Sequence, residues 1–423
     1  MIAAKRTDRP ALENFLLAHY ERHTRSVGVR SAPFLLLLDP ASVCQLQCPM
    51  CPTGLENARQ VRHNRAQYRA RGLMGRALFD AILDELGGHL YFVHLYNWGE
   101  PLLNPDLGYF IRRLAERGIA TDTNTNLSLP LSDRAIDELV MSGIDRIEAS
   151  IDGFSQESYG RYRVKGRFEL ARDNLVRLAR ARDRLNSPLQ LAWNYLVFRF
   201  NEHEIDAARA YCEDHGIEFV RREAALSEAL REEFLPTYRA GERLEGFFEK
   251  RAQSFDPAEF ENRGEASCAW HYFYSVVNAD GSVSPCCAPW EDDWDVGSVE
   301  PGRQGFLDIW NNPRYRRARA DVSGHRLIAW LRGTGQLGLV RSNEDFARLG
   351  SLCEGCLMPP AMLDLYTHRA DLVVTHFEQN LAGLYPDLKQ AFALVRREPA
   401  AFAALFERSF PALRPASGHP PRS

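Results

Sequence analysis

The chain has 423 residues, of which 45% are hydrophobic and 26% charged, a composition typical of a globular protein with room for two or three domains. Its formal net charge of −4 argues against a general nucleic-acid-binding protein. The apolar run PFLLLLD at 33–39 is too short to cross a membrane, and the N-terminus lacks the apolar stretch of a signal peptide. We therefore expect a cytoplasmic protein without nucleic-acid or membrane partners, in which cysteines serve as ligands or reactive thiols rather than disulfides.

Strand and helix patterns alternate along the first half of the chain. An amphipathic helix is predicted over 10–24. Strands are predicted over 34–40, 90–98, 119–126, 145–153, 189–201 and 217–223. Helices are predicted over 75–88, 105–118, 132–143, 168–186 and 202–216. This alternation predicts an α/β fold, a partial (β/α)6 TIM-like barrel with its functional residues on the loops after the strands.

The alternation of strand and helix patterns ends near residue 224, and the remainder of the chain is predicted to be helical apart from a cysteine-bearing segment. Five segments are expected: an N-terminal helical segment, a barrel, a helical linker, a cysteine-bearing domain, and C-terminal helices with a tail. Their bounds are 1–33, 34–223, 224–262, 263–360 and 361–423.

Three cysteines follow the first predicted strand directly. Cys44, Cys48 and Cys51 have the spacing C-x3-C-x2-C. Three soft thiolates on one loop suit a [4Fe–4S] cluster with one iron left open. A zinc site with its fourth ligand elsewhere is the alternative, because C-x2-C pairs are common zinc ligands.

This loop and its place after a barrel strand resemble the radical S-adenosylmethionine (SAM) superfamily, and the resemblance extends over 34–223. It implies that the open iron binds the amino and carboxylate groups of SAM. It also implies that the reduced cluster cleaves SAM to methionine and a 5′-deoxyadenosyl radical, which abstracts hydrogen from a substrate. An external electron donor such as flavodoxin or ferredoxin would reduce the cluster.

Residues after the later strands match positions that bind SAM in that family. The stretch NWGEP at 97–101 resembles the GGEP motif, with Trp98 in place of its first glycine, and Glu100 is expected to accept hydrogen bonds from the SAM ammonium group. Arg163 is expected to bind the SAM carboxylate, with Arg161 as the competing choice. The full set expected to contact SAM is Met50, Trp98, Gly99, Glu100, Pro101, Asn126, Ser150, Asp152, Arg163, Asn194 and Leu196.

A second group of cysteines lies in the last third of the chain. Cys268, Gly281 and Cys286 form C-x12-G-x4-C, and SLCEGC adds Cys353 and Cys356. This pattern resembles the opening of SPASM and twitch domains, which carry auxiliary [4Fe–4S] clusters, whereas a zinc site with four cysteine ligands is the alternative. A full SPASM domain has three further cysteines, which LMPPAMLDLYTHR lacks. One auxiliary [4Fe–4S] cluster is therefore expected, bound by Cys268, Cys286, Cys353 and Cys356.

Cys287 is adjacent to one of these ligands. It has three interpretations: it replaces Cys286 as the ligand, it donates a hydrogen atom to a substrate radical, or it packs as a small buried side chain. Cys212, within a predicted helix, is expected to be structural.

The resemblance leaves the substrate open. A fully ligated auxiliary cluster can accept an electron, so we expect oxidation of a small molecule such as a sugar or cyclitol. The arginine-rich stretch at 58–72 favours an anionic substrate, although most such runs are solvated surfaces. The alternatives are a peptide-modifying enzyme, an epimerase, and a non-catalytic metal-binding or electron-transfer protein. The 33 residues before the first predicted strand are too few for a leader-binding winged helix, which favours the small molecule.

Overall fold

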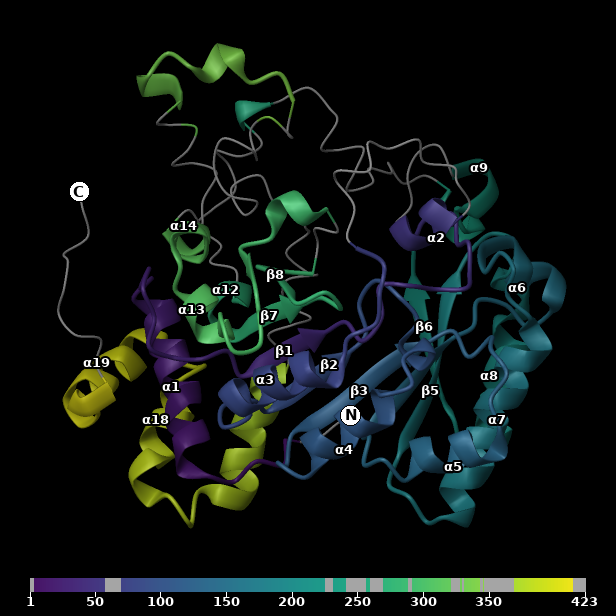
Figure 1. Ribbon diagram of the computed structural model, residues 1–423, viewed down its shortest axis with the longest axis horizontal. Coiled ribbons are helices and arrows are strands. Elements are labelled where there is room, and N and C mark those ends of the chain that lie inside the picture. The colour runs from purple at the N-terminus through teal and green to yellow at the C-terminus, as the bar shows by residue number, and fades with distance from the viewer. Residues whose placement is uncertain are drawn as a thin grey trace.

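The computed structural model describes residues 4–57, 70–224, 231–240, 256–258, 269–287, 291–320, 328, 331–342, 345 and 369–413. Within these residues the strands form one sheet in the order β6-β5-β4-β3-β2-β1-β7-β8-β9, with helices packed along it (Figure 1). The pairs from β6 to β7 are parallel, and β8 and β9 join antiparallel. The strands are β1 Leu35–Leu38, β2 Phe92–Leu95, β3 Ala120–Thr125, β4 Arg146–Ser150, β5 Gln190–Val197, β6 Glu218–Glu223, β7 Tyr274–Val277, β8 Ser282–Ser284 and β9 Gly297–Ser298.

The helices alternate with the first six strands, as the sequence predicts. Between and before these strands lie α1 Arg9–His23, α2 Pro52–Asn57, α3 Arg76–Leu86, α4 Leu107–Ala115, α5 Asp133–Val140, α6 Gln156–Tyr162, α7 Phe168–Arg184 and α8 Ile205–Asp214. The later helices include α9 Arg231–Phe234, α12 Trp270–Phe273, α13 Phe306–Trp310, α14 Pro313–Ala320, α18 Lys389–Leu394 and α19 Pro399–Ser409. The predicted α/β class with a partial (β/α)6 barrel is confirmed, because β1 to β6 are parallel and adjacent in chain order.

Local chemistry explains where these elements begin and end. Ser132 caps α5, since its Oγ accepts a hydrogen bond from the backbone N–H of Ala135 over 3.1 Å. Gly143 follows that helix with φ of +93°, a conformation that side chains with a Cβ rarely adopt. In α4 the apolar side chains recur on one buried face, at Leu107, Phe110, Ile111 and Leu114.

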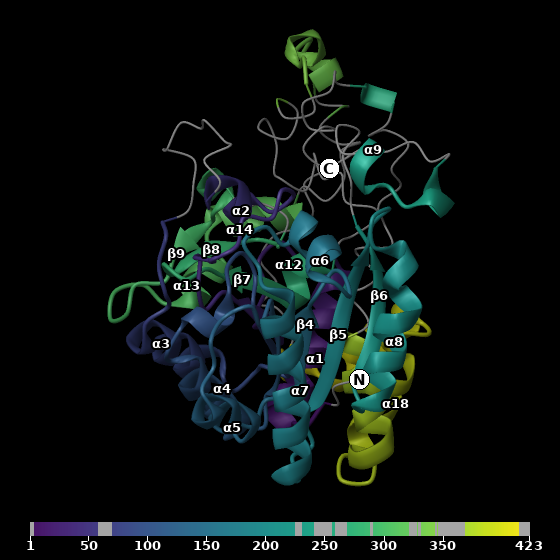
Figure 2. The ribbon, with the colours of Figure 1, turned by 90° about the vertical axis from the view of Figure 1, so that its right-hand side faces the viewer.

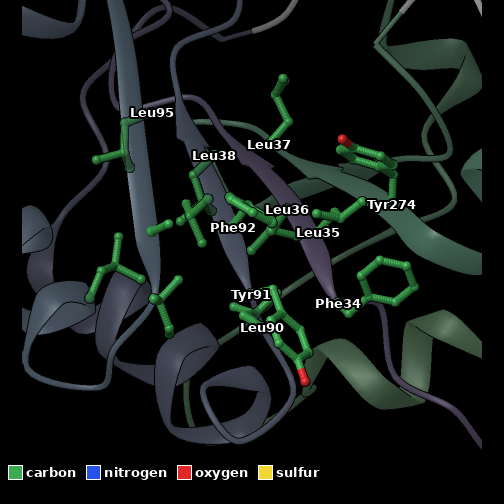
Figure 3. Packing of buried hydrophobic residues seen from close by; sticks show 14 of the residues in the cluster. Phe34, Leu35, Leu36, Leu37, Leu38, Leu90, Tyr91, Phe92, Leu95 and Tyr274 are labelled. Atoms are coloured by element: carbon green, nitrogen blue, oxygen red, sulfur yellow. The ribbon is translucent and has the colours of Figure 1, made fainter. Parts of the chain in front are cut away.

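The sheet extends further than the alternation pattern predicts. Strand β7, from the cysteine-bearing second part of the chain, pairs in parallel with β1. All four leucines of β1 are buried, and Figure 3 shows Leu35, Leu36 and Leu38 near Phe92 of β2 and Tyr274 of β7. A strand with neighbours on both edges and both faces covered reads as a continuous apolar run, which explains the sequence LLLL. The cysteine loop therefore starts from the centre of the sheet.

The two ends of the described chain pack against each other. Helix α1 lies beside α18 and α19 (Figures 1 and 2). The ring of Phe15 stacks on Phe392 at 5.6 Å between centroids, and that of Tyr20 on Phe406 at 4.7 Å. Phe15 also contacts Phe34, which directly precedes β1, so this packing lies at the N-terminal ends of the strands. The opposite, C-terminal ends stay available for the cysteine loop.

Within the part of the chain that the structure describes, no helix has both the length and the apolar character of a membrane span.

Candidate functional site

Cys44, Cys48 and Cys51 lie between β1 and the start of α2, at the C-terminal edge of the sheet, as predicted. Burial raises the pKa of the Cys44 thiol to about 12 and that of Cys48 to about 11, and the nearby thiols add to the effect. Two of the three clustered thiols thus resist ionisation, and added positive charge is needed before they ionise together. Bound iron supplies such charge, so the chemistry of the donors fits an iron–sulfur cluster.

The spacing of the sulfurs bears on the kind of metal site. Among the described residues, no three His, Cys, Asp or Glu side chains converge on one metal ion. A [4Fe–4S] cluster does not need such convergence, because each thiolate binds a different iron. A single tetrahedral zinc does need it. The three cysteines can therefore serve a cluster with one thiolate to each of three irons.

The cysteine loop is closed by tight backbone contacts. A Cβ added at Gly54 would lie 2.4 Å from the backbone oxygen of Cys48, and one at Gly99 would lie 1.8 Å from that of Ala41. The backbone N–H of Glu100 donates to the oxygen of Val43 over 2.8 Å. The NWGEP loop thus packs directly against the cysteine loop, and Gly99 is required for that contact.

Trp98 stands where the family motif has its first glycine, and its backbone contacts the segment after the cysteines. Its backbone oxygen accepts a hydrogen bond from Oγ1 of Thr53 over 2.7 Å. Pro101 begins the short helix Pro101–Leu103, which the Glu100 side chain caps. The departure from the motif therefore leaves the loop in contact with the cysteines.

The Glu100 carboxylate is buried and already accepts three hydrogen bonds. Oε1 accepts from Oγ1 of Thr125 over 2.6 Å and from the backbone N–H of Leu102 over 3.0 Å, and Oε2 accepts from that of Asn126 over 2.8 Å. Burial raises the pKa of Glu100, and these hydrogen bonds offset part of the rise. Glu100 therefore ties its own loop to the end of β3, and Oε2 keeps acceptor capacity for a ligand.

Asn126, which is predicted to contact SAM, lies beside the cysteine loop. Its Nδ2 is 3.7 Å from Sγ of Cys44, and its Oδ1 accepts a hydrogen bond from Nε2 of Gln45 over 2.8 Å. Gln45 was not singled out from the sequence, although its place inside the C-x3-C spacing was an available signal.

Asp152, Arg163 and Leu196 meet at one point next to Cys48. The Arg163 Nε donates to Oδ2 of Asp152 over 2.6 Å, and the backbone N–H of Leu196 donates to Oδ1 over 2.8 Å. The Nη1 of Arg163 lies 4.0 Å from Sγ of Cys48. Burial raises the pKa of Asp152, and the Arg163 charge opposes that rise. The site thus holds a buried guanidinium at the cluster loop.

Arg161, the competing residue, lies elsewhere. Its side chain is 48% exposed, its Nη2 is 3.9 Å from Glu233, and its guanidinium lies over the Phe200 ring. The structure therefore brings Arg163 rather than Arg161 to the cysteines.

The remaining predicted SAM contacts also lie at this edge. Ser150 Oγ donates to Oδ1 of Asn124 over 2.5 Å, and Oδ1 of Asn194 accepts from Nε of Arg222 over 2.9 Å. Neither Asn124 nor Arg222 was singled out from the sequence. Both follow from strand alternation once the neighbouring strands are known.

An apolar cluster borders the same loop. Met50, Leu196 and the loop cysteines pack against buried residues that include Leu46 and Phe198. Met50 and Leu196 thus border the same apolar cluster, and their contact with SAM stays a prediction.

Two further clusters of polar side chains lie on one face of the sheet, the face of Asp122 and Glu148, which we call the inner side. Neither cluster was singled out from the sequence. His94 Nδ1 on β2 lies 2.6 Å from Oδ1 of Asp122 on β3, and Arg369 donates from Nη2 to Oδ2 of Asp122 over 3.0 Å. On β4, Glu148 accepts from Arg146 over 2.9 Å and from Arg222 over 3.1 Å. A parallel sheet with buried charged groups on one face differs from an all-apolar core.

Of the four predicted ligands of the auxiliary cluster, Cys286 lies within the described residues. Cys286 and Cys287 follow β8, are half-buried, and pack against the main core. Cys268, Cys353 and Cys356 lie outside the described residues, as do residues 58–69 of the arginine-rich stretch. Cys212 is fully buried in α8, as expected for a structural cysteine.

Two family models match the chain. Residues 39–209 match the radical SAM superfamily, and residues 268–356 match SPASM, the iron–sulfur cluster-binding domain.

Curated relatives differ in the substrates that their names give. The chain is 28% identical over 169 residues to dTDP-4-amino-4,6-dideoxy-D-glucose ammonia-lyase of Streptomyces venezuelae, a match that covers 39% of this chain and 33% of that protein. It therefore spans about a third of that relative's length. It is 25% identical over 299 residues to PqqA peptide cyclase of Granulibacter bethesdensis, covering 65% of this chain and 75% of that protein.

Solved structures with some likeness were also found. Streptococcus suis SuiB bound to S-adenosylmethionine has a TM-score of 0.48 at 14% identity, with 68% of each chain covered. BtrN in complex with AdoMet and 2-DOIA has a TM-score of 0.39 at 17% identity, covering 70% of this chain and 89% of that one.

Proposed function

We propose that this chain, a radical SAM enzyme that belongs to the radical SAM superfamily and carries a SPASM iron–sulfur domain, oxidises a polar small molecule such as a sugar. When bound, the cluster and SAM supply a carbon radical that removes a hydrogen atom from the substrate. The names of the relatives leave the reaction type open, since one is a lyase and the other a cyclase.

The chain's own residues have distinct tasks in this proposal. Cys44, Cys48 and Cys51 hold the cluster. Glu100 fixes the NWGEP loop and offers an oxygen to the SAM ammonium group, and Arg163 presents its guanidinium to the SAM carboxylate. These roles are supported by the burial and contacts of Glu100 and Arg163 beside the cysteine loop.

The polar side chains on the inner side of the sheet are the observation that favours a hydroxylated substrate. His94, Asp122, Glu148 and Asn194 supply hydrogen-bonding groups on four neighbouring strands, and Arg222 adds a guanidinium. These groups already pair with one another, but carboxylate and amide oxygens accept more than one hydrogen bond, so a hydroxylated ligand adds hydrogen bonds here that an apolar ligand does not. A sugar is therefore favoured over an apolar side chain.

A peptide substrate is the second candidate, and one observation favours it. The match to PqqA peptide cyclase covers 65% of this chain, whereas the match to the sugar ammonia-lyase covers 39%. The longer match reaches beyond the barrel.

Deuterium transfer tests the substrate class. The reduced, reconstituted enzyme is given SAM with ring-deuterated dTDP-4-amino-4,6-dideoxy-D-glucose or with deuterated PqqA peptide, and 5′-deoxyadenosine is analysed by mass. Deuterium from the sugar nucleotide and a product two hydrogens lighter support the proposal. Loss of ammonia instead contradicts oxidation, and transfer from the peptide alone establishes the second candidate. A variant with Cys44, Cys48 and Cys51 all replaced by Ala is the negative control.

Iron analysis tests the single auxiliary cluster. Two [4Fe–4S] clusters require about eight irons per chain. Cys353→Ala combined with Cys356→Ala should remove about half the iron, preserve SAM cleavage and stop product formation. About four irons plus one zinc in the unmodified enzyme would contradict both the auxiliary cluster and the oxidation.

A further inference from the structure

We propose that His94 is a substrate-binding residue whose Nε2 forms a hydrogen bond with a substrate hydroxyl group, and that Asp122 and Arg369 are positioning residues that hold its ring. This inference rests on the proposed function, because it takes the substrate to be hydroxylated and to lie on the inner side of the sheet.

Three side chains from separate elements form a continuous chain of contacts. His94 Nδ1 on β2 is 2.6 Å from Oδ1 of Asp122 on β3, and Nη2 of Arg369 is 3.0 Å from Oδ2 of the same carboxylate. The side chains of His94 and Asp122 are each 7% exposed, and that of Arg369 is 19% exposed. Both carboxylate oxygens of Asp122 are therefore engaged in a site that largely excludes water.

The charge state of Asp122 fixes which nitrogen of His94 carries the proton. Burial alone would raise the pKa of Asp122, but its contacts with His94 and Arg369 outweigh burial and hold that pKa below its ordinary value. An ionised carboxylate only accepts hydrogen bonds, so Nδ1 of His94 donates to it. Nε2, on the far side of the ring from Asp122, then hydrogen-bonds a hydroxyl group as a donor when the ring is charged and as an acceptor when it is neutral.

Aromatic neighbours set the plane of the His94 ring. Tyr274 on β7 stacks on it, with ring centroids 6.1 Å apart and planes 11° apart, and Tyr96 meets it edge-on at 5.9 Å. Among the residues that the structure describes, none forms a hydrogen bond with Nε2, and the His94 side chain is 7% exposed. The ring is thus held on three sides, and its remaining polar edge suits a ligand.

His94 and Asp122 lie on the same strands as the predicted SAM-binding loops, but nearer the N-terminal ends of those strands. Asp122 and Asn126 lie on the same strand and its end, four residues apart, which is about 13 Å of extended chain. Asn126 contacts Cys44, so four residues of strand β3 and its end separate the His94–Asp122 pair from the cysteine loop. Side chains two residues apart share a face of a strand, so Asn124 continues the same inner row.

Substrate kinetics separate this role from a structural one. The reconstituted enzyme is assayed with dTDP-4-amino-4,6-dideoxy-D-glucose as wild type, His94→Gln, Asp122→Asn and His89→Gln. His89 precedes β2 at the opposite end of the strand and serves as the matched control. We expect KM to rise about tenfold in His94→Gln with a smaller change in kcat, a smaller rise in Asp122→Asn, and no change in His89→Gln.

Two readouts check that the cofactor site is intact. SAM cleavage without substrate, and the electron paramagnetic resonance spectrum of the reduced enzyme with SAM, should match the wild type in His94→Gln. An unchanged KM in that variant overturns the inference, and so does a loss of the spectrum, because His94 would then support the cluster site instead.

The inference and the proposed function fail in different ways. If the wild type processes the PqqA peptide and not the sugar nucleotide, the proposed small-molecule function fails. The same variants are then measured with that peptide: a raised KM in His94→Gln retains His94 as a binding residue, and an unchanged KM overturns it.

Discussion

Arg163 donates a hydrogen bond from Nε to Oδ2 of Asp152 over 2.6 Å, just beyond the end of β4. The same guanidinium lies 4.0 Å from Sγ of Cys48. The carboxylate therefore holds a positive charge against the cysteine loop, where an anionic group of a ligand can meet it.

Asp152→Asn should weaken SAM binding with little loss of iron. A hydrogen bond to a charged group contributes about 1.5–3 kcal/mol, which corresponds to about tenfold or more in affinity. Equilibrium dialysis with SAM measures the change. Arg161→Ala is the control, since Arg161 is half exposed and away from the cysteines. Equal weakening in both variants would contradict the assignment of Arg163.

Glu100→Gln should lower both the stability of the protein and its affinity for SAM. The amide replaces one acceptor oxygen with a donor, so a buried donor among Thr125, Leu102 and Asn126 loses its partner. An unsatisfied buried donor costs about 1–3 kcal/mol in the free energy of unfolding, as measured by urea denaturation. Glu116→Gln, on the surface, should change neither quantity. A drop in SAM affinity at unchanged stability would show that Glu100 does not anchor its loop.

Gly99→Ala should disrupt cluster binding. The added Cβ would lie 1.8 Å from the backbone oxygen of Ala41, so the cysteine loop or the NWGEP loop has to move. Overpacking of this kind typically costs about 1–3 kcal/mol, and the displaced loop should bind less iron. Gly75→Ala is the matched control, because a Cβ there meets nothing within 4 Å. Wild-type iron content in Gly99→Ala would contradict this packing.

His271 should make the protein less stable at mildly acidic pH. Burial lowers the pKa of His271 to about 3, whereas an unfolded histidine titrates near about 6.5. As pH falls below about 6.5 the unfolded state takes up a proton that the folded state does not. The stabilisation is complete above that pH and declines toward pH 3, by about 1.4 kcal/mol per pH unit.

Urea denaturation at several pH values between about 6 and 4 measures this slope. His271→Gln should flatten it by up to one proton, whereas His203→Gln, at an exposed position, should not. An equally steep slope in His271→Gln would show that other groups cause the acid sensitivity.

Local patterns in the sequence determined the order of the barrel elements. Apolar spacing, a serine cap and terminal glycines are properties of neighbouring residues, so 132–143 was predicted as a helix and is observed as α5. Short α6 lacked a sufficiently long periodic pattern and was missed. The three cysteines were also a local signal, because their spacing and their place after a buried strand lie within one short stretch.

Contacts between distant residues were decided only by the tertiary structure. Asp122 and Arg369 are 247 residues apart, and nothing in the sequence around either residue identifies the other as its partner. The pairing of β7 with β1 and the packing of α1 on α19 are of the same kind.

The sequence by itself thus determined the cysteine loop and the polar residues at the strand ends, because chemistry and spacing there are local. Only the tertiary structure selected Arg163 over Arg161, showed that Glu100 is held by β3, and placed His94 on the inner side of the sheet. Strand alternation gives two possible faces for each side chain. Packing of neighbouring strands and the C-terminal helices decides which face is enclosed.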